Sequence, residues 1–238
     1  MKKVSNIDYK AYSKKQYDKI YRSTIYFEKF ISKYIDLNSK NIIDLGCGGG
    51  ANTLYLAKKY SNSNFLGVDI SENLLKMGNN KLKDHKNIQN LKFKRDNWVN
   101  IHRYKKDFDG IISFQTLSFL PFSYKVSLKN LNKNNFEFLA FSSLFYSGKC
   151  NYKIEIDDFS IKKNQSEKTK YIFSINTLKS YLKSNGYKNF KYLNFNIDID
   201  LPKPKHGGTE SYTMKLENKK RIIFSGGLYL PYGFILAY

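Results

Sequence analysis

The stretch that decides the fold is Asp44-Leu45-Gly46-Cys47-Gly48-Gly49-Gly50-Ala51. It follows a short apolar run at residues 41–45 and precedes a segment with helical spacing at 51–57. Because glycine has no Cβ atom, the glycines at 46, 48 and 50 permit backbone angles that are closed to other residues, and they allow a ligand to lie against the main chain. The pattern predicts a strand, a tight turn and a helix, with a ligand site at the turn.

Strands and helices alternate on the C-terminal side of this turn. The predicted strands are at 64–68, 91–95, 110–114 and 136–142, and the predicted helices are at 71–83 and near 124–131. On the N-terminal side, residues 7–36 carry apolar side chains at three- and four-residue steps, which predicts a helical segment. This alternation is typical of an α/β fold with a parallel sheet covered on both faces.

The last third of the chain departs from the alternation. Residues 147–170 are polar and lysine-rich without a clear period, which predicts a loop or a small lid. A helix at 176–185 and a strand at 190–196 are expected next, and runs at 211–216, 221–229 and 233–237 predict an antiparallel hairpin at the sheet edge. We expect one domain, residues 1–238, made of a helical cap at 1–39, a cofactor-binding core at 40–146, a lid-like insertion at 147–175 and a substrate-side part at 176–238.

The composition excludes several classes of protein. With 238 residues, 41% of them hydrophobic, the chain can bury a core, so disorder of the whole is excluded. The two cysteines, Cys47 and Cys150, are too few for a disulfide framework or a four-cysteine zinc site. The basic start of the chain, Met1-Lys2-Lys3, is not followed by an apolar stretch, and no run approaches the roughly 18 to 20 apolar residues that cross a bilayer. We therefore expect a cytoplasmic protein without a membrane span.

The net charge of +21 suggests a nucleic-acid partner, because clustered cations release counterions from phosphates. Only four of the 41 basic residues are arginine, however, and arginine is the better bidentate ligand of phosphate and guanine. The lysines are spread along a chain that is also rich in Asn, Ile, Tyr and Phe, residues that share A/T-rich codons. A genome poor in G and C accounts for this composition, so we favour a solvated basic surface that attracts anionic small molecules over nucleic acid.

Two acidic residues frame the glycine turn and decide between two cofactors. Asp69 ends the second predicted strand, where a carboxylate can accept both hydroxyls of a ribose. The pattern Gly46-x-Gly48-x-x-Ala51 also satisfies the nicotinamide-dinucleotide fingerprint, but the carboxylate of Asp44 just ahead of it would repel a pyrophosphate. The same carboxylate suits the ammonium of the methionine half of S-adenosylmethionine. A nicotinamide-dependent Rossmann enzyme is therefore the alternative that Asp44 disfavours.

These residues resemble the motifs of the Class I S-adenosylmethionine-dependent methyltransferases. The family's first motif corresponds to residues 44–50, its ribose-binding acid to Asp69, its adenine-binding acid to Asp96 and its fourth motif to 108–114. The resemblance implies a Rossmann-like, seven-stranded, mostly parallel sheet in the order 3-2-1-4-5-7-6, with the last strand antiparallel and helices on both faces. It also implies S-adenosylmethionine as the cofactor and S-adenosylhomocysteine as the product.

The resemblance implies roles for single residues as well. Asn97 and Trp98 would flank the adenine ring, and residues 115–117 would line the methionine end. Side chains of the N-terminal helix, Tyr12, Tyr17 and Arg22, would cover the cofactor. The predicted cofactor-binding residues are Asp44, Gly46, Cys47, Gly48, Gly50, Asn52, Asp69, Ile70, Asp96, Asn97, Trp98, Phe114 and Gln115.

The methyl acceptor is narrowed mainly by motifs that the sequence lacks. Enzymes that methylate base amino groups carry Asn/Asp-Pro-Pro-aromatic after the fourth strand, whereas this chain has Ser-Phe-Gln-Thr at 113–116. Neither cysteine is placed for pyrimidine C5 chemistry, and no acidic cluster predicts a metal site. A hydroxyl acceptor would gain from a general base, for which His206 in the loop 205–212 is the first candidate, followed by Glu210 and Tyr212.

We expect an O-methyltransferase that acts on a small polar metabolite, such as a sugar of a bacterial surface polysaccharide. An RNA methyltransferase acting on transfer or ribosomal RNA is the second hypothesis, supported by the basic charge. A catalytically silent methyltransferase-like subunit, which binds the cofactor without turnover, is the third. The sequence predicts no oligomeric state.

Overall fold

The computed structural model of the chain describes residues 9–105, 107–120, 128–129, 131–132, 135–156, 168–204, 211–218 and 220–238. Within these ranges, no helix has the length and apolar character needed to cross a membrane. The helix predicted near 124–131 falls mostly on residues outside them.

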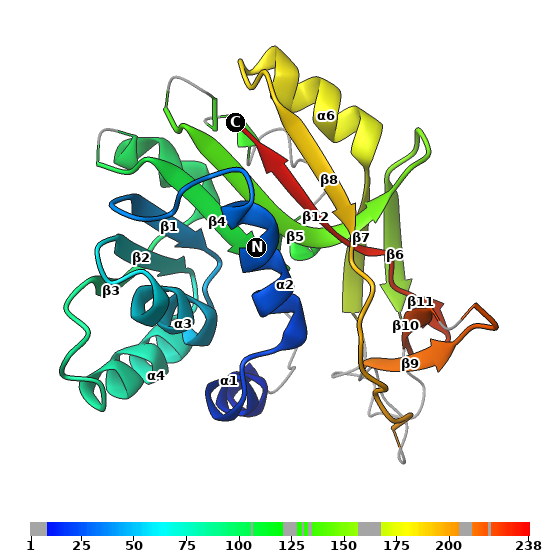
Figure 1. Cartoon of the computed structure of the whole chain (residues 1–238), viewed down its shortest axis with the longest axis horizontal. Coiled ribbons are helices and arrows are strands. Elements are labelled where there is room, and N and C mark those ends of the chain that lie inside the picture. Colours follow the sequence, from blue (N-terminus) through cyan, green and yellow to red (C-terminus); the bar gives the residue numbers. More distant parts are fainter. Residues whose placement is uncertain are drawn as a thin grey trace.

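Seven strands follow one another across the central sheet in the order β3-β2-β1-β4-β5-β12-β8. The first five pair in parallel, and β12 runs antiparallel to both β5 and β8 (Figure 1). This confirms the predicted Rossmann-like order, in which the last strand inserts between the fifth and the sixth. The strands of this path are β1 (Asn41–Leu45), β2 (Asn64–Asp69), β3 (Leu91–Arg95), β4 (Gly110–Phe114), β5 (Phe138–Tyr146), β8 (Phe190–Asn194) and β12 (Tyr232–Ala237).

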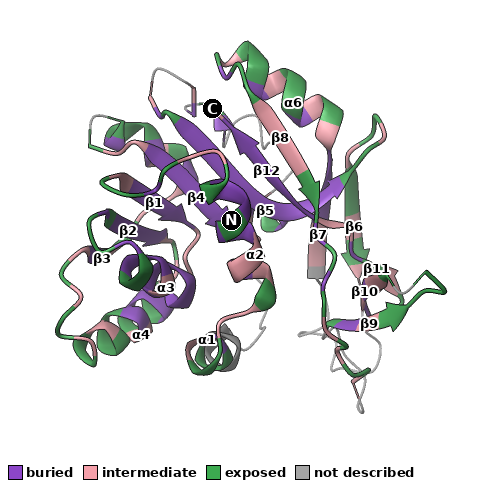
Figure 2. Cartoon of the chain, in the orientation of Figure 1, coloured by how far each residue is buried: buried purple, intermediate pink, exposed green. Residues whose placement is uncertain are grey.

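The core lies in two layers, one on each face of the central sheet. Neighbouring residues of a strand point to opposite faces, so Ile42 belongs to one layer and Ile43 to the other. The inner strands β1, β4, β5 and β12 are buried along most of their length, whereas the edge strands β3 and β8 and the outer faces of the helices are partly exposed (Figure 2). The layer of Ile42 is covered by α2 (Arg22–Ser32) and α3 (Ala51–Lys59). The layer of Ile43 is covered by η1 (Trp98–Tyr104) and α6 (Ile175–Ser184). Of the other helices, α4 (Glu72–Lys83) connects β2 to β3, and η2 (Thr116–Phe119) follows β4.

The helical segment predicted for residues 7–36 is two helices, α1 (Tyr9–Asp18) and α2. The helix is interrupted at Tyr21, whose backbone is extended at φ −70° and ψ 147°. The apolar period continues across this break, so the sequence pattern did not reveal it. The break leaves α1 against the glycine turn, while α2 packs Phe27 and Ile31 onto the sheet.

The lysine-rich segment predicted as a loop or small lid contains two antiparallel strands, β6 (Tyr152–Ile156) and β7 (Lys168–Ser174). The loop prediction is therefore wrong for these residues. β7 pairs in parallel with Phe145 and Tyr146 of β5, beyond the point where β4 ends. Tyr171, Ile172 and Phe173 of β7 are buried one after the other, and the polar, lysine-rich residues before them in the sequence obscured this short apolar run.

The sequence predicted that the two β-like runs after residue 210 form a hairpin at the edge of the central sheet, and this prediction is wrong. They form a separate antiparallel sheet of β9 (Ser211–Lys215), β10 (Arg221–Ser225) and β11 (Leu228–Tyr229), at the lower right of Figure 1. Ile223 and Leu230 attach this sheet to the core. Of the described strands after residue 210, β12 enters the central sheet. It lies between β5 and β8, so β8 is the edge strand on this side.

Candidate active site

The glycine turn between β1 and α3 has three residues in the left-handed region, Gly46 at φ 80°, Gly48 at φ 57° and Gly50 at φ 83°. A Cβ atom at Gly46 would lie 2.3 Å from Thr116, and one at Gly50 would lie 2.2 Å from the ring of Phe93. A Cβ atom at Gly48 would meet nothing within 4 Å. Packing within the protein therefore requires two of these glycines, and the main chain is open to a ligand at Gly48.

Asp44, at the end of β1, is completely buried. Its Oδ2 atom accepts a hydrogen bond of 2.5 Å from Thr53 Oγ1, and its Oδ1 atom has no partner. Burial, with a smaller contribution from the charge of Asp69, raises the pKa of Asp44 to about 7. An unpartnered carboxylate oxygen is costly to bury, so a cationic ligand group at this place would supply what the site lacks.

Asp69 ends β2 and is bonded to the glycine turn. Its Oδ2 atom accepts from the Gly48 amide at 2.9 Å, and its Oδ1 atom accepts from the Ser71 amide at 2.8 Å. The thiol of Cys47 lies in the field of Asp44 and Asp69, and burial together with these charges raises its pKa well above the usual value. The thiol stays protonated at neutral pH, which agrees with the sequence-based exclusion of Cys47 as a nucleophile.

Asp96, after β3, is held by three donors. The Asn97 amide and Asn100 Nδ2 donate to its Oδ1 atom at 2.7 and 2.8 Å, and the Tyr104 hydroxyl donates to its Oδ2 atom at 2.7 Å. The Lys94 ammonium lies 4.8 Å from the centre of the Tyr104 ring. Partial burial would raise the pKa of Asp96, but these hydrogen bonds outweigh it and the pKa lies below its ordinary value. The carboxylate is ionised, and its Oδ2 atom keeps a lone pair for a ligand N–H.

The structure places the two predicted neighbours of the adenine ring differently. Asn97 precedes η1 and its Oδ1 atom accepts from the Val99 amide at 3.3 Å. Trp98 is buried in the core and stacks on Phe141 with 6.2 Å between ring centres, while its Nε1 atom has no partner. The indole is therefore part of the core, and its predicted contact with the adenine ring stays a prediction.

Large apolar side chains are exposed in the segments that follow three strands of the central sheet, β2, β3 and β4. Ile70 follows β2, Val99 follows β3 and Phe119 closes the short helix after β4, with 41%, 43% and 45% of their surfaces exposed. The carboxyl ends of parallel strands lie at one edge of a sheet, where α/β proteins bind ligands. Sequence reasoning named Ile70 and missed Val99 and Phe119, because the short 3-10 helices that carry them are too brief for a periodic signal.

The end of β4 is joined to the glycine turn. Gln115 has a left-handed backbone at φ 60°, unusual for a residue with a side chain, and its amide donates to the Ser142 carbonyl at 2.7 Å. Thr116 Oγ1 donates to the Gly46 carbonyl at 2.9 Å. Phe114, also predicted at this site, contacts Phe27 of α2 edge-on at 5.2 Å. The start of η2 is thereby fixed beside the turn.

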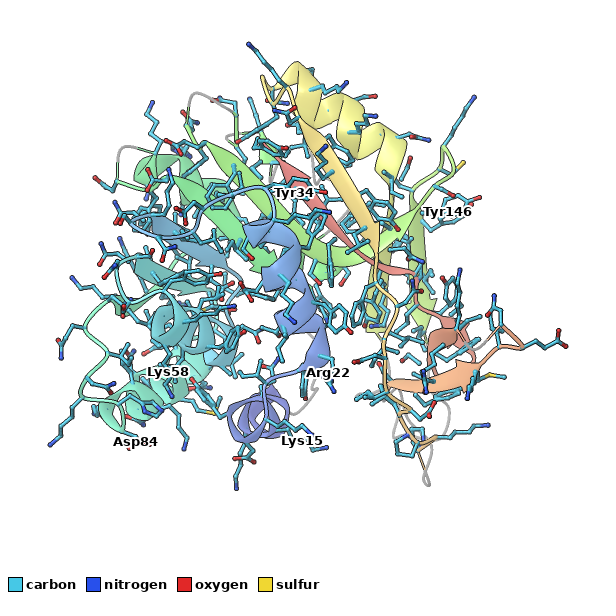
Figure 3. The ribbon with its side chains drawn as sticks, viewed as in Figure 1. Lys15, Arg22, Tyr34, Lys58, Asp84 and Tyr146 are labelled. Atoms are coloured by element: carbon cyan, nitrogen blue, oxygen red, sulfur yellow. The ribbon has the colours of Figure 1, made fainter. Side chains whose placement is uncertain are left out.

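The N-terminal helices contact the same turn. The Tyr17 hydroxyl of α1 donates to the Gly49 carbonyl, and Thr24 Oγ1 of α2 donates to Asn52 Oδ1 at 2.8 Å. Arg22, labelled at the start of α2 in Figure 3, forms an ion pair with Asp198, with 3.5 Å between Nε and Oδ1. Tyr17 therefore contacts the turn, and its predicted role of covering the cofactor stays a prediction. The side chain of Tyr12 lies outside the described residues.

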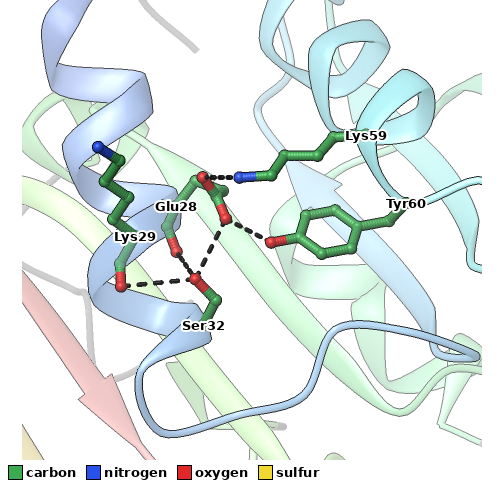
Figure 4. Close-up of polar contacts among 5 residues, drawn as sticks. All are labelled: Glu28, Lys29, Ser32, Lys59 and Tyr60. Carbon is green, nitrogen blue, oxygen red and sulfur yellow. Dashed lines mark hydrogen bonds and ion pairs between the residues drawn. The ribbon is translucent and has the colours of Figure 1, made fainter.

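A buried carboxylate holds α2 in position. Glu28 accepts from Lys59 Nζ at 2.7 Å, from Ser32 Oγ at 3.1 Å and from the Tyr60 hydroxyl (Figure 4). Burial alone would raise the pKa of Glu28, but the bonds from Lys59 and Tyr60 hold it below its ordinary value. These contacts join α2 to the end of α3, the helix that begins at the glycine turn.

Of the predicted catalytic residues, His206 and Glu210 lie outside the described residues. Tyr212 is in β9, where its hydroxyl donates to the Gly226 carbonyl at 2.9 Å and its ring stacks on Phe224 at 5.7 Å. Within the described ranges, no group of three or more His, Cys, Asp and Glu side chains is arranged to hold a metal ion.

Comparisons with known proteins agree with this geometry. Residues 36–194 match the family of methyltransferase domains. An uncharacterized protein of Rickettsia prowazekii is 29% identical over 113 residues, which are 45% of this chain and 45% of that protein. The release factor glutamine methyltransferase of Buchnera aphidicola is 43% identical over 75 residues, 31% of this chain and 26% of that protein. The matched segments span less than half of either relative.

A solved structure extends the likeness of fold over almost the whole chain. A SAM-dependent methyltransferase from Aquifex aeolicus has a TM-score of 0.56 at 14% identity, with 98% of each chain covered. The family match covers more than half of the chain, from just after α2 to the end of β8, and includes the glycine turn. The chain therefore belongs to the methyltransferase domain family, the class I S-adenosylmethionine-dependent methyltransferases of Rossmann-like fold.

Proposed function

We propose that this chain transfers the methyl group of S-adenosylmethionine to a hydroxyl oxygen of a small polar acceptor, such as a sugar or a sugar-linked group. The observation that supports this cofactor is the unpartnered Oδ1 atom of buried Asp44, at the end of β1, next to the turn that is open at Gly48. An ammonium group supplies the donor that this oxygen lacks, whereas a pyrophosphate would bring negative charge toward it. The site thus favours a sulfonium nucleoside over a nicotinamide dinucleotide.

Three carboxylates would hold the cofactor. Asp44 would bind its ammonium, Asp69 would accept from the ribose hydroxyls, and Asp96 would accept from the adenine amino group. Ile70 and Val99, both exposed, offer apolar contacts to the faces of the adenine ring. The bound cofactor supplies a methyl group activated by a sulfonium, so the protein has mainly to orient the acceptor and exclude water.

The acceptor would approach over the carboxyl end of β4, where the glycine turn and η2 meet. The exposed ring of Phe119 lies on this side and offers a flat apolar surface of the kind that suits a sugar ring. The sequence Ser-Phe-Gln-Thr at 113–116 lacks the Pro-Pro motif of enzymes that methylate base amino groups. These features support a small hydroxyl acceptor.

A hydroxyl acceptor must lose its proton as the carbon–oxygen bond forms. His206 is the general base that we propose, and Glu210 is the second candidate. Tyr212 is less suited, because its hydroxyl donates to the Gly226 carbonyl.

The charge of +21 favours RNA as the second candidate acceptor, since basic surfaces bind phosphate backbones in a salt-dependent way. The two hypotheses differ in a simple property. Protein that acts on RNA should copurify with nucleic acid that high salt removes, whereas an enzyme for small acceptors should not.

Two measurements test the proposal. The first is calorimetry of the full chain with S-adenosylmethionine, S-adenosylhomocysteine and NADH, in which we expect heat from the first two ligands and none from NADH. Asp44→Asn should lose this binding, and Asp84→Asn, on the exposed end of α4, is the matched control. Tight binding of NADH alone would overturn the cofactor assignment.

The second measurement follows a labelled methyl group from S-adenosylmethionine into a panel of carbohydrates and nucleotide sugars, and separately into transfer RNA. Label in an ether of a sugar supports the proposal. Label in RNA with none in the panel favours the second candidate. Binding of the cofactor without transfer to any acceptor indicates a silent subunit.

A further inference from the structure

A lysine ammonium and an exposed aromatic ring meet at the acceptor side of the site. Lys170 Nζ of β7 lies 5.5 Å from the centre of the Phe119 ring. Phe119 is 45% exposed, and Lys170 is partly exposed. An ammonium over an aromatic face is held by the quadrupole of the ring, so its position is fixed without the ring being covered.

The backbone places this pair near the glycine turn, where the methyl donor is proposed to bind. η2 begins at Thr116, whose side chain donates to the Gly46 carbonyl, and ends at Phe119, a single turn later. β7 enters the sheet at Phe173, opposite Phe145, in the place that β4 vacates after its last pair with Ser142. Lys170 lies three residues before Phe173 on β7, and η2 begins two residues after Phe114, the last residue of β4 that pairs with β5.

Within the described residues of β6 and β7 the carboxylate is that of Glu155, and it lies on the other face of this strand pair. Lys170 is paired in register with Ile154, and the next pair is Thr169 with Glu155. Neighbouring pairs of a hairpin point to opposite faces, so the carboxylate of Glu155 does not share a face with Lys170. Glu155 is ion-paired with Lys153 on its own strand. The ammonium therefore gives its face of the hairpin a positive border beside apolar side chains.

We propose that Phe119 and Lys170 form an acceptor subsite for an acidic group, a phosphate or a carboxylate, carried by the molecule that is methylated. The ring would contact the carbon skeleton, and the ammonium would bind the anion. An ammonium has three donor hydrogens, so it can bind an anion and keep its other contacts. This inference rests on the proposed function for the position of the acceptor, and it narrows the acceptor class from polar to acidic.

The test is calorimetry on the full chain saturated with S-adenosylhomocysteine. The probes are glucose 1-phosphate and glucose, which differ only in the phosphate, with glucuronate as the carboxylate arm. We expect the wild type to bind glucose 1-phosphate at least about tenfold more tightly than glucose. Lys170→Met keeps the length of the side chain and removes the charge, so this variant should bind glucose 1-phosphate and glucose with the same affinity. Phe119→Ala should weaken the binding of both sugars.

The chain offers a matched control. Lys179 Nζ of α6 lies 6.0 Å from the centre of the Phe190 ring, so Lys179→Met removes an ammonium–ring contact of the same kind away from the glycine turn. This variant should keep the wild-type ratio. Binding of S-adenosylhomocysteine itself should be unchanged in Lys170→Met; a loss there would mean that the ammonium serves the carboxylate of the cofactor, and the inference would be wrong.

The remaining outcomes separate this inference from the proposed function. A wild type that does not prefer the phosphorylated or the acidic sugar, including one that binds none of the probes, counts against the acidic subsite. If labelled methyl enters neutral sugars at rates that Lys170→Met leaves unchanged, the proposed function stands and this inference fails. If the acceptor is an amine or RNA, the proposed function fails, while the loss of the ratio in Lys170→Met still supports the subsite.

Discussion

The hydroxyl of Tyr17 donates a hydrogen bond to the carbonyl of Gly49, across 32 positions of sequence. This contact joins α1 to the glycine turn at the point between the open Gly48 and the start of α3. α1 therefore restricts the turn on which the cofactor is expected to lie. The phenol is largely buried, and burial raises its pKa, so the hydroxyl stays a donor at neutral pH.

Tyr17→Phe should weaken the binding of S-adenosylhomocysteine. A single hydrogen bond contributes about 0.5–1.5 kcal/mol, which corresponds to roughly two- to tenfold in affinity. Calorimetry measures this change. Tyr34→Phe is the control, because Tyr34 follows the far end of α2 and stacks on Tyr238 (Figure 3). Equal affinity in Tyr17→Phe and the wild type would show that α1 does not restrain the turn.

Asp44 should make cofactor binding depend on pH. Burial raises the pKa of Asp44 to about 7. Below that pH the carboxyl group is mostly protonated, and it must lose its proton before it can bind the ammonium of the cofactor. The affinity for S-adenosylhomocysteine should rise with pH by up to about tenfold per unit and level off near pH 7. Asp44→Asn should bind weakly with no such slope, and Asp84→Asn should keep the slope. The pH range from about 5.5 to about 7.5 reaches from below the Asp44 pKa of about 7 to above it. A wild-type affinity that does not change over this range would contradict the role of Asp44.

Gly48 and Gly50 should respond differently to alanine. Both have a left-handed backbone, which costs an alanine about 1–2 kcal/mol. At Gly50 the new methyl group would also lie 2.2 Å from Phe93, so Gly50→Ala should lower the free energy of unfolding by roughly 3 kcal/mol or more. Gly48→Ala should lower it by the backbone cost alone and lose at least about tenfold in cofactor affinity, because the methyl group fills the open space. Thermal unfolding and calorimetry separate the two effects, and equal loss of stability would refute the distinction.

The parts of the fold that the sequence predicted are those in which buried strands and glycines determine the chain path. The stretch from Asp44 to Ala51 required a strand, a turn and a helix, and the resemblance then implied the strand order that the central sheet has. Gly233-Phe234-Ile235-Leu236 likewise belongs to a strand between two antiparallel partners. Such segments are buried on both faces, so their composition carries the signal.

The parts that the sequence did not predict are those in which tertiary contacts override local pattern. β6 and β7 mix apolar residues with charged ones, and what defines them as strands is their pairing with each other and the pairing of β7 with the end of β5. The separate sheet of β9 to β11 depends on Ile223 and Leu230 reaching the core. At the candidate site, no sequence motif marks the hydrogen-bond donors to Asp96 or the exposed ring of Phe119. Their roles depend on neighbours that only the fold brings together.

Tyr104 should tune recognition of the adenine ring. Its hydroxyl donates to Oδ2 of Asp96, the carboxylate oxygen that keeps a lone pair for the adenine amino group. Tyr104→Phe should weaken S-adenosylhomocysteine binding by a few fold and narrow the preference for it over its inosine analogue, which has a carbonyl in place of the amino group. Competition binding measures the ratio. Tyr229→Phe, at an exposed position of β11, is the control. An unchanged ratio with weaker binding would leave Tyr104 with a structural role only.

Glu28 should make stability depend on pH in the acid range. Its hydrogen bonds hold its pKa in the folded chain below the ordinary value of 4.5, so its contribution to stability is present above pH 4.5 and is lost as the pH falls below it. Glu28→Gln removes the charge but keeps an acceptor for Tyr60 and Ser32, so it should lower the free energy of unfolding at neutral pH by about 1–3 kcal/mol. The same variant should show a smaller loss of stability on acidification than the wild type. Urea unfolding at pH values above and below 4.5 measures both effects, with Glu137→Gln, at an exposed ion pair with Lys40, as the control. Because Glu28 joins α2 to the end of α3, a Glu28→Gln chain that unfolds with the wild-type free energy at every pH would show that these contacts do not hold the two helices together.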